Sequence, residues 1–175
     1  KCSANDEGGG GVYNYNGRII MSGGLITDCH GTGNSYRGGG GVFLSTDNAK
    51  FTMSGGEITY CDGYYGGGVR VGAGGHFEMS GGRIAYCKAF VQGGGVDLLD
   101  WSSTALISGS ALIEDCQAPR GGAVEASSGG SLTITGGTMR ANTATDGYGG
   151  AAQITMGNVW ISGGVFENNS AKTGG

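Results

Sequence analysis

The chain has 175 residues, enough for one domain with a core of its own. Glycine supplies 42 of them and proline only 1, without the Gly-X-Y period of collagen, and the 38% of hydrophobic residues argues against intrinsic disorder. The 10 basic and 14 acidic residues leave a net charge of -4, with no lysine or arginine cluster to neutralise nucleic-acid phosphates. No apolar run is long enough to predict a membrane span.

Three short motifs recur in a fixed order, and the first of them recurs at steps of 30, 27, 27, 28 and 28 residues. The first is Gly-Gly-x-Val, the second is an apolar residue before Ser-Gly or Thr-Gly, and the third is an apolar residue three positions before cysteine or asparagine. A fixed period of this length predicts supersecondary units that stack on one another. The first motif ends at Val12, Val42, Val69, Val96, Val124 and, in a degenerate copy, Ala152.

Apolar residues within each repeat alternate with polar ones instead of following a helical period. Phe51 and Met53, for example, flank Thr52, and a Gly-Gly pair follows directly. This pattern predicts strands of three to five residues joined by glycine corners that turn the chain between sheets. We therefore expect an all-β, right-handed, single-stranded parallel β-helix of about six coils of ~27 residues, with three short strands per coil.

Stacking the coils in register predicts inward columns that form one continuous core. The first column is the valine series above. The others are Ile19, Phe51, Phe77, Ala105, Leu132 and Val159; Met21, Met53, Met79, Ile107, Ile134 and Ile161; and Ile26, Ile58, Ile84, Ile113, Met139 and Phe166.

These motifs resemble repeats of bacterial surface proteins over essentially the whole chain. Gly-Gly-x-Val together with residues 166–169, Phe-Glu-Asn-Asn, is similar to the GGxI and FxxN repeat pair of chlamydial polymorphic outer-membrane proteins. The stretch 66–82 resembles the "MSGG" repeats of large surface proteins from gut Firmicutes. The resemblance implies a β-helical adhesin or passenger domain, extracellular or on the cell surface. The chain departs from it by placing cysteine where the family has asparagine in four of six copies.

A column of cysteine and asparagine is expected at one corner, with one residue per coil. Neighbouring cysteines would have Cα atoms roughly 4.8 Å apart, which is compatible with a disulfide, although five cysteines leave one over. The alternatives are small buried apolar residues, disulfides between coils, or a redox or metal column, the last without any CxxC or Cys/His cluster to support it. We predict a structural ladder of Cys2, Cys29, Cys61, Cys87, Cys116, Asn142 and Asn169.

Two pairs of aromatic residues occupy equivalent positions in adjacent coils. Tyr13 aligns with Phe43, and Tyr60 aligns with Tyr86 just before the cysteine column. Exposed aromatic rows are typical of surfaces that bind a glycan or a host or cell-surface protein. The alternative is cross-strand stacking that only stabilises a sheet face.

Asp97 and Glu125 form the one pair of acidic residues in matching positions of adjacent coils. A polysaccharide hydrolase requires paired carboxylates, about 6.5–9.5 Å apart in an inverting enzyme. The carboxylates of Asp97 and Glu125 are expected to be closer, near the roughly 4.8 Å spacing of adjacent strands. Arg70 lies one coil below, and an ion pair of Arg70 and Asp97 at the surface is the simpler interpretation. We therefore predict no enzyme, no catalytic residue, no cofactor and no metal ligand.

The repeat begins at the cysteine motif and stops at Gly174-Gly175, where the next Gly-Gly-x-Val would start. We expect one domain, residues 1–175, uncapped at both ends, that is either part of a longer solenoid or a subunit that stacks head to tail into a filament. The predicted function is a non-catalytic structural or adhesive rod, extracellular or at the cell surface. The alternatives are a self-assembling filament subunit and a polysaccharide lyase or hydrolase.

Overall fold

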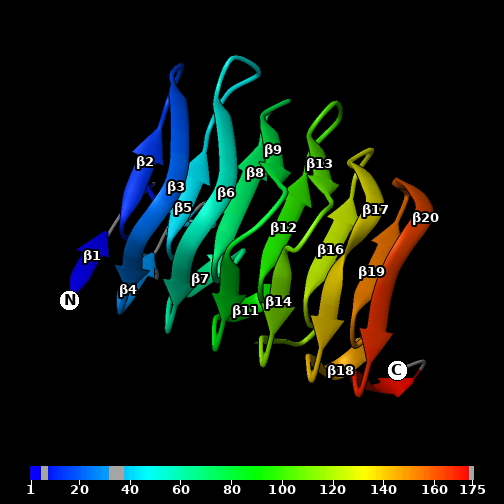
Figure 1. Cartoon of the computed structure of the whole chain (residues 1–175). Coiled ribbons are helices and arrows are strands. Elements are labelled where there is room, and N and C mark those ends of the chain that lie inside the picture. The colour runs from blue at the N-terminus through cyan, green and yellow to red at the C-terminus, as the bar shows by residue number, and fades with distance from the viewer. Residues whose placement is uncertain (5–7, 32–37, 174–175) are drawn as a thin grey trace.

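The computed structural model describes residues 1–4, 8–31 and 38–173, which are strands, turns and bends without a helix. The strands pair in parallel, and coils about 27 residues apart stack into a β-solenoid of about six turns. Figure 1 shows the coils succeeding one another from the N-terminus to the C-terminus. The predicted fold class is thereby confirmed, whereas residues 32–37 and 174–175 lie outside the described part.

Three parallel sheets form the sides of the solenoid, and each coil contributes to all of them. The valine sheet consists of β2 (Val12–Asn14), β5 (Val42–Leu44), β8 (Val69–Gly72), β12 (Val96–Leu99), β16 (Val124–Ser127) and β19 (Ala152–Thr155). The bent sheet consists of β3 (Arg18–Thr27), β6 (Lys50–Thr59), β9 (His76–Met79), β10 (Arg83–Ala85), β13 (Thr104–Ile107), β14 (Leu112–Glu114), β17 (Ser131–Arg140) and β20 (Asn158–Glu167). The cysteine sheet consists of β1 (Cys2–Ala4), β4 (Cys29–Gly31), β7 (Asp62–Tyr65), β11 (Lys88–Gln92), β15 (Gln117–Ala118), β18 (Thr143–Tyr148) and β21 (Ser170–Thr173).

The predicted inward columns form the core, except that Val159, Ile161 and Phe166 in the last coil are exposed. Val42, Val69, Val96 and Val124 pair in register along the valine sheet, and all four are buried. The rings of Phe51 and Phe77 stack with centres 5.1 Å apart inside the bent sheet. Each coil covers the apolar face of the one before it, so the core continues through the stack.

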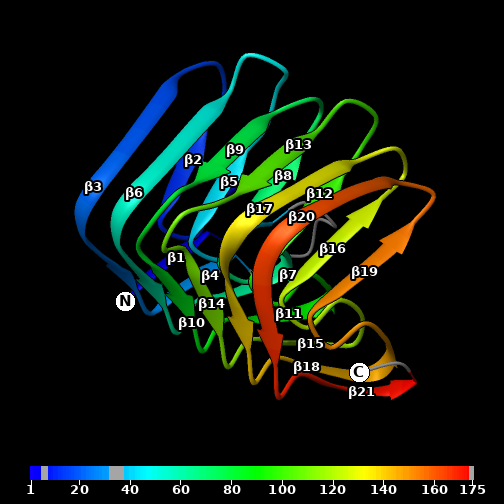
Figure 2. The ribbon, with the colours of Figure 1, turned by 45° about the vertical axis from the view of Figure 1, so that its right-hand side comes forward.

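The Ser-Gly-Gly step differs from the expectation. It does not carry the chain from one sheet to another, because β3, β6, β17 and β20 each run through it as one strand of 10 residues. The second glycine takes a positive φ, +85° at Gly56 for example, and the pairing register shifts there before parallel pairing resumes. The step therefore bends a single sheet, as the curved ribbon of β20 in Figure 2 shows.

The turn from the bent sheet to the cysteine sheet depends on residues that are not glycine. The residue just before each cysteine or asparagine of the column has a φ of +51° to +56°. Aspartate and asparagine tolerate this left-handed conformation and occupy three of the turns, but tyrosine and alanine rarely adopt it and occupy the other three, so the sequence does not mark the turn in every coil. The residues are Asp28, Tyr60, Tyr86, Asp115, Ala141 and Asn168.

The turn from the cysteine sheet to the valine sheet requires glycine because two backbones come close together. A Cβ at Gly67 would lie 2.5 Å from the carbonyl oxygen of Lys88 and 2.4 Å from that of Gly94. Similar backbone contacts occur in the other described coils. The positions are Gly10, Gly40, Gly67, Gly94, Gly122 and Gly150.

Replacing Gly67 by alanine should lower the free energy of unfolding by about 3 kcal/mol, because the obstructing atoms are backbone and cannot turn aside. Gly23→Ala is the matched control, since a Cβ there would meet nothing within 4 Å. We expect the control to change stability by less than about 1 kcal/mol. Urea denaturation followed by circular dichroism measures both, and equal effects would show that the close approach is unimportant.

Candidate functional site

Tyr60 and Tyr86 stack on the outside of the solenoid, as their alignment predicts. Their ring centres are 4.9 Å apart with planes 13° from parallel, and 57% and 37% of their surface is exposed. The guanidinium of Arg83 lies 5.1 Å from the ring centre of Tyr86. The pair is an exposed aromatic surface, and its use in binding remains a prediction.

The other predicted pair is only half exposed, which corrects the sequence-based expectation. Tyr13 is exposed, but Phe43 retains 7% of its surface. Their rings meet edge-on at 5.5 Å, and the guanidinium of Arg70 lies between the rings of Phe43 and Tyr65, 4.9 and 4.8 Å from their centres. Phe43 is thus enclosed by aromatic and cationic neighbours and does not contribute to an exposed surface.

Asp97 and Glu125 also differ from their predicted place at the surface, because both are fully buried. They are opposite one another on β12 and β16, next to Arg70 on β8, so their predicted alignment is confirmed. The glycine turn covers them: a Cβ at Gly93 or Gly121 would lie within 3 Å of the Cβ of Asp97 or Glu125, respectively. A weak surface ion pair is therefore the wrong description of these acids.

A hydrogen-bond chain connects Asp97 to the turns that cover it. Arg120 donates to the Gln92 side-chain oxygen at 2.7 Å, and the Gln92 amide donates to Asp97 Oδ1 at 2.9 Å and to Ser127 Oγ at 3.0 Å. On the next rung, Thr155 Oγ1 donates to Glu125 Oε1 at 3.0 Å. Within the described part of the chain, Asp97 Oδ2 and Glu125 Oε2 accept no hydrogen bond.

Burial controls the ionisation of both acids. Desolvation raises the pKa of Asp97 to about 7, although the charge of Arg70 and the Gln92 hydrogen bond oppose it. Desolvation likewise raises the pKa of Glu125 to about 7 against the Thr155 hydrogen bond and the charge of Arg120. Because neither side chain is accessible to solvent, the pair is not positioned to touch a polysaccharide substrate.

The cysteine column lies inside the solenoid next to the left-handed turn. Cys2 is exposed, whereas Cys29, Cys61, Cys87 and Cys116 are buried, and all five are free thiols. Cys61 Sγ lies 3.3 Å from the carbonyl oxygen of Thr59 and 3.8 Å from that of Ile26 in the preceding coil, so its single proton can be donated to either. Disulfides between coils, the alternative left open by the sequence, are not present among these cysteines.

In the last two coils asparagine occupies the column position of cysteine, and its side-chain oxygen also accepts a hydrogen bond. Asn142 Nδ2 donates to the carbonyl oxygen of Ile113 at 3.0 Å, the position equivalent to Ile26 for Cys61. Asn142 Oδ1 accepts from the backbone N–H of Cys116 at 3.0 Å, and Asn169 Oδ1 accepts from that of Asn142 at the same distance. Both residue types thus donate to the same kind of buried carbonyl.

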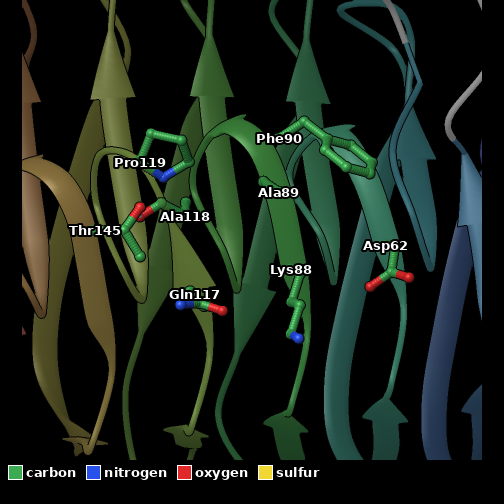
Figure 3. A pocket seen from close by; sticks show the side chains of 8 residues that line it. All are labelled: Asp62, Lys88, Ala89, Phe90, Gln117, Ala118, Pro119 and Thr145. Carbon is green, nitrogen blue, oxygen red and sulfur yellow. The ribbon is translucent and has the colours of Figure 1, made fainter.

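A shallow groove on the outer face of the cysteine sheet was not predicted. Its volume is about 330 Å³, and its lining comes from β7, β11, β15 and β18 with the turn residue that follows β15. Figure 3 shows Lys88 and Phe90 of β11 on neighbouring outward positions, with Gln117 and Pro119 in the next coil. The remaining lining residues are Asp62, Ala89, Ala118 and Thr145.

A second hollow of about 480 Å³ adjoins the groove and shares Phe90 and Pro119 with it. It adds Tyr148, which is exposed, and Arg120, the residue that begins the hydrogen-bond chain to Asp97. Phe90 lines both hollows, with 60% of its surface exposed. The sequence did offer a signal for this site, because Phe90 and Pro119 each stand three residues after a column cysteine.

An ion-pair network on the bent sheet was likewise missed. Glu114 is buried between Arg83 and Arg140, whose Nε atoms donate to its two oxygens, at 2.7 Å for Arg140. The hydrogen bonds and charges of the two arginines outweigh the effect of burial and lower the pKa of Glu114. Glu114 is thus occupied by structural partners.

No family model, curated protein or solved structure matches the chain in the comparisons made. The resemblance to bacterial surface repeats therefore stays a prediction. Within residues 1–4, 8–31 and 38–173, no helix is long and apolar enough to span a membrane. In the same part of the chain, no three His, Cys, Asp or Glu side chains are grouped to hold a metal ion.

The buried thiols should be unreactive while the chain is folded. Burial raises the pKa of Cys29 to about 12, and the Cys87 side chain together with burial raises the pKa of Cys61. Since the thiolate is the reactive form, a thiol reagent at pH 8 should modify only Cys2 in the native chain and all 5 cysteines in denaturant. Cys2→Ser should abolish the native reaction, and fewer than five thiols in the unreduced, unfolded chain would indicate disulfides.

The buried acids should make the solenoid more stable as the pH falls from 8 to 5. The folded chain protonates Asp97 and Glu125 near pH 7, whereas the unfolded chain does so near pH 4, so between these values folding takes up protons. Ionised Asp97 alone costs the folded state on the order of 4 kcal/mol. Urea titrations over this range should show the rise.

Asp97→Asn should reduce this pH dependence to the part that Glu125 contributes, because asparagine keeps an acceptor for Gln92 and has no charge to desolvate. Asp115→Asn, at an exposed carboxylate, is the matched control and should leave the slope as it is in the original chain. A slope that is the same in all three proteins would contradict the assignment.

Proposed function

We propose that this solenoid is a non-catalytic structural and adhesive rod, extracellular or at the cell surface, as part of a surface protein or fibre. The observation that supports it most directly is the groove on the cysteine sheet, which takes its lining from consecutive coils and therefore follows the direction of stacking. A rod with such a face presents a binding surface along its length. The resemblance of the repeats to bacterial surface proteins favours the same location.

The cysteine column has a structural part in this proposal. Cys29, Cys61, Cys87 and Cys116 act as a ladder that replaces the asparagine ladder over most of the rod, since both side chains donate to the same kind of carbonyl. Their burial keeps them from oxidants, so free thiols are compatible with an extracellular location.

Two other functions are weighed against the rod. A polysaccharide lyase or hydrolase is disfavoured, because Asp97 and Glu125, the acids aligned in adjacent coils among the residues that the structure describes, are buried from solvent. A filament subunit stays the other alternative: Ile161 and Phe166, which belong to inward columns, are half exposed in the last coil. A further coil of a longer solenoid or a second copy stacked there would cover them.

Three measurements on the purified chain test the proposal. Arrays of neutral glycans, acidic glycans and matrix proteins should retain the labelled chain on at least one class of ligand. Retention on none of them, by a chain that negative-stain microscopy shows as isolated particles, would contradict the adhesive rod. Microscopy that instead shows fibres, dispersed by Ile161→Lys, would replace it with the filament.

The enzyme is tested separately by incubating the chain with acidic and neutral polysaccharides and measuring new reducing ends and unsaturated products. We expect no turnover. Turnover that Asp97→Asn or Glu125→Gln abolishes, while Asp115→Asn does not, would establish the enzyme and overturn the non-catalytic rod.

A further inference from the structure

The outer face of the cysteine sheet separates polar from apolar side chains into two parallel rows. Successive residues of a strand point to opposite faces, so Lys88 and Phe90 point outward on either side of Ala89. In the next coil Gln117 takes the place of Lys88, with which it pairs, and Pro119 lines the same groove as Phe90, although β11 has one residue more than β15 before Gln92 pairs with Arg120. One row is therefore polar and the other apolar, and both follow the stacking direction.

The floor between the two rows is flat because the inward residues of this sheet are small. Ala89 and Ala118 are buried, and the sheet has only alanine or glycine at this place. The close approach of the glycine turn leaves no space for a larger inward side chain. The same packing that forms the turn thus leaves a straight, open strip of backbone outside.

The charges beside the strip balance. Lys88 stands directly opposite Asp62 in the adjacent strand, Asp62 Oδ2 also lies 3.1 Å from His30 Nδ1, and Gln117 on the other side of Lys88 is neutral. A polyanion would meet the carboxylate of Asp62, and a polycation would meet the ammonium of Lys88. The pattern suits a neutral ligand that has hydroxyl groups along one edge and an apolar face along the other.

The length of the groove suits a chain and not a single small molecule. From Asp62 on β7 to Thr145 on β18 the lining crosses three rungs, or roughly 14 Å at the usual strand spacing. The adjoining hollow with exposed Tyr148 extends the apolar side beyond Phe90. An extended ligand with flat rings can place one ring face against Phe90 and Pro119 while its hydroxyls reach Lys88 and Gln117.

We infer that the groove binds a neutral, extended β-linked polysaccharide that lies parallel to the solenoid axis. Phe90 and Pro119 contact the apolar ring faces, and Lys88, Gln117 and Asp62 hydrogen-bond the hydroxyl edge. The inference rests on the proposed adhesive function and names the ligand class and the residues that recognise it.

Isothermal titration calorimetry with cellohexaose tests it. We expect binding that Phe90→Ala weakens about tenfold or more and that Gln117→Ala weakens several-fold. Tyr15→Ala is the matched control, an equally exposed aromatic residue of the first coil outside both hollows, and should bind as the original chain does. The native thiol count checks that each variant is folded.

Two further probes separate the outcomes. Maltohexaose, which is neutral but curved, and a hexamer of galacturonic acid, which is acidic, should bind at least tenfold more weakly than cellohexaose. Tighter binding of the acidic hexamer, or equal affinity of Phe90→Ala and Tyr15→Ala for cellohexaose, would overturn the inference. Absence of cellohexaose binding would overturn it too, while retention on another class of arrayed ligand would leave the adhesive rod standing.

Discussion

The close approach of two backbones at one corner of every coil is the constraint on which the rest of the solenoid depends. At Gly67 the chain leaves the cysteine sheet and enters the valine sheet with no space for even a methyl group. The neighbouring strand can then have only glycine or alanine on its inner side, such as Gly63 and Ala89. Large core residues are therefore confined to the other two sheets, where valine, phenylalanine, methionine and isoleucine form the stacked columns.

The polar groups of the other corner, where the chain turns from the bent sheet into the cysteine sheet, need partners because most of the column residues there are buried. Beside the left-handed turn, a carbonyl of the preceding coil faces the column residue, as that of Ile26 faces Cys61. Asn142 satisfies such a carbonyl with its amide, and Cys116 approaches its own, that of Ile84, at 3.9 Å. The longer contact is the weaker one, but the thiol is smaller and more apolar, which suits a fully buried site. Compared with asparagine, cysteine at this position makes a weaker hydrogen bond but is less costly to bury.

Repetition made the fold predictable. Once valine, phenylalanine and methionine positions recur at one interval, the register of each sheet follows, and the register found for Phe51 and Phe77 is the one expected. Backbone conformation was less predictable at turns where no glycine indicates a positive φ. Tyr60 and Tyr86 adopt a positive φ without being glycine, and the Gly55-Gly56 pair that resembled a full corner only bends a strand.

The burial of Asp97 and Glu125 could not be read from their own strands. Alternation correctly placed both on the outer face of the valine sheet, opposite one another. What covers them is the preceding turn, with Gln92 and Arg120, and a turn that folds back over a face leaves no periodic trace in the sequence. An outward position is a position at the surface only where nothing lies over it.

The two outer faces behave differently for one reason. On the valine sheet the glycine turns fold over the outward residues, and the enclosed polar groups satisfy one another, as Arg120, Gln92 and Asp97 do. On the cysteine sheet the same turns approach from the inside, so the outward residues Lys88, Phe90 and Gln117 stay uncovered. The open face continues across β7, β11, β15 and β18, whose residues line the groove. A ligand that lies along the solenoid axis would therefore bind to the outer face of the cysteine sheet, because the glycine turns lie on the inner side of that sheet.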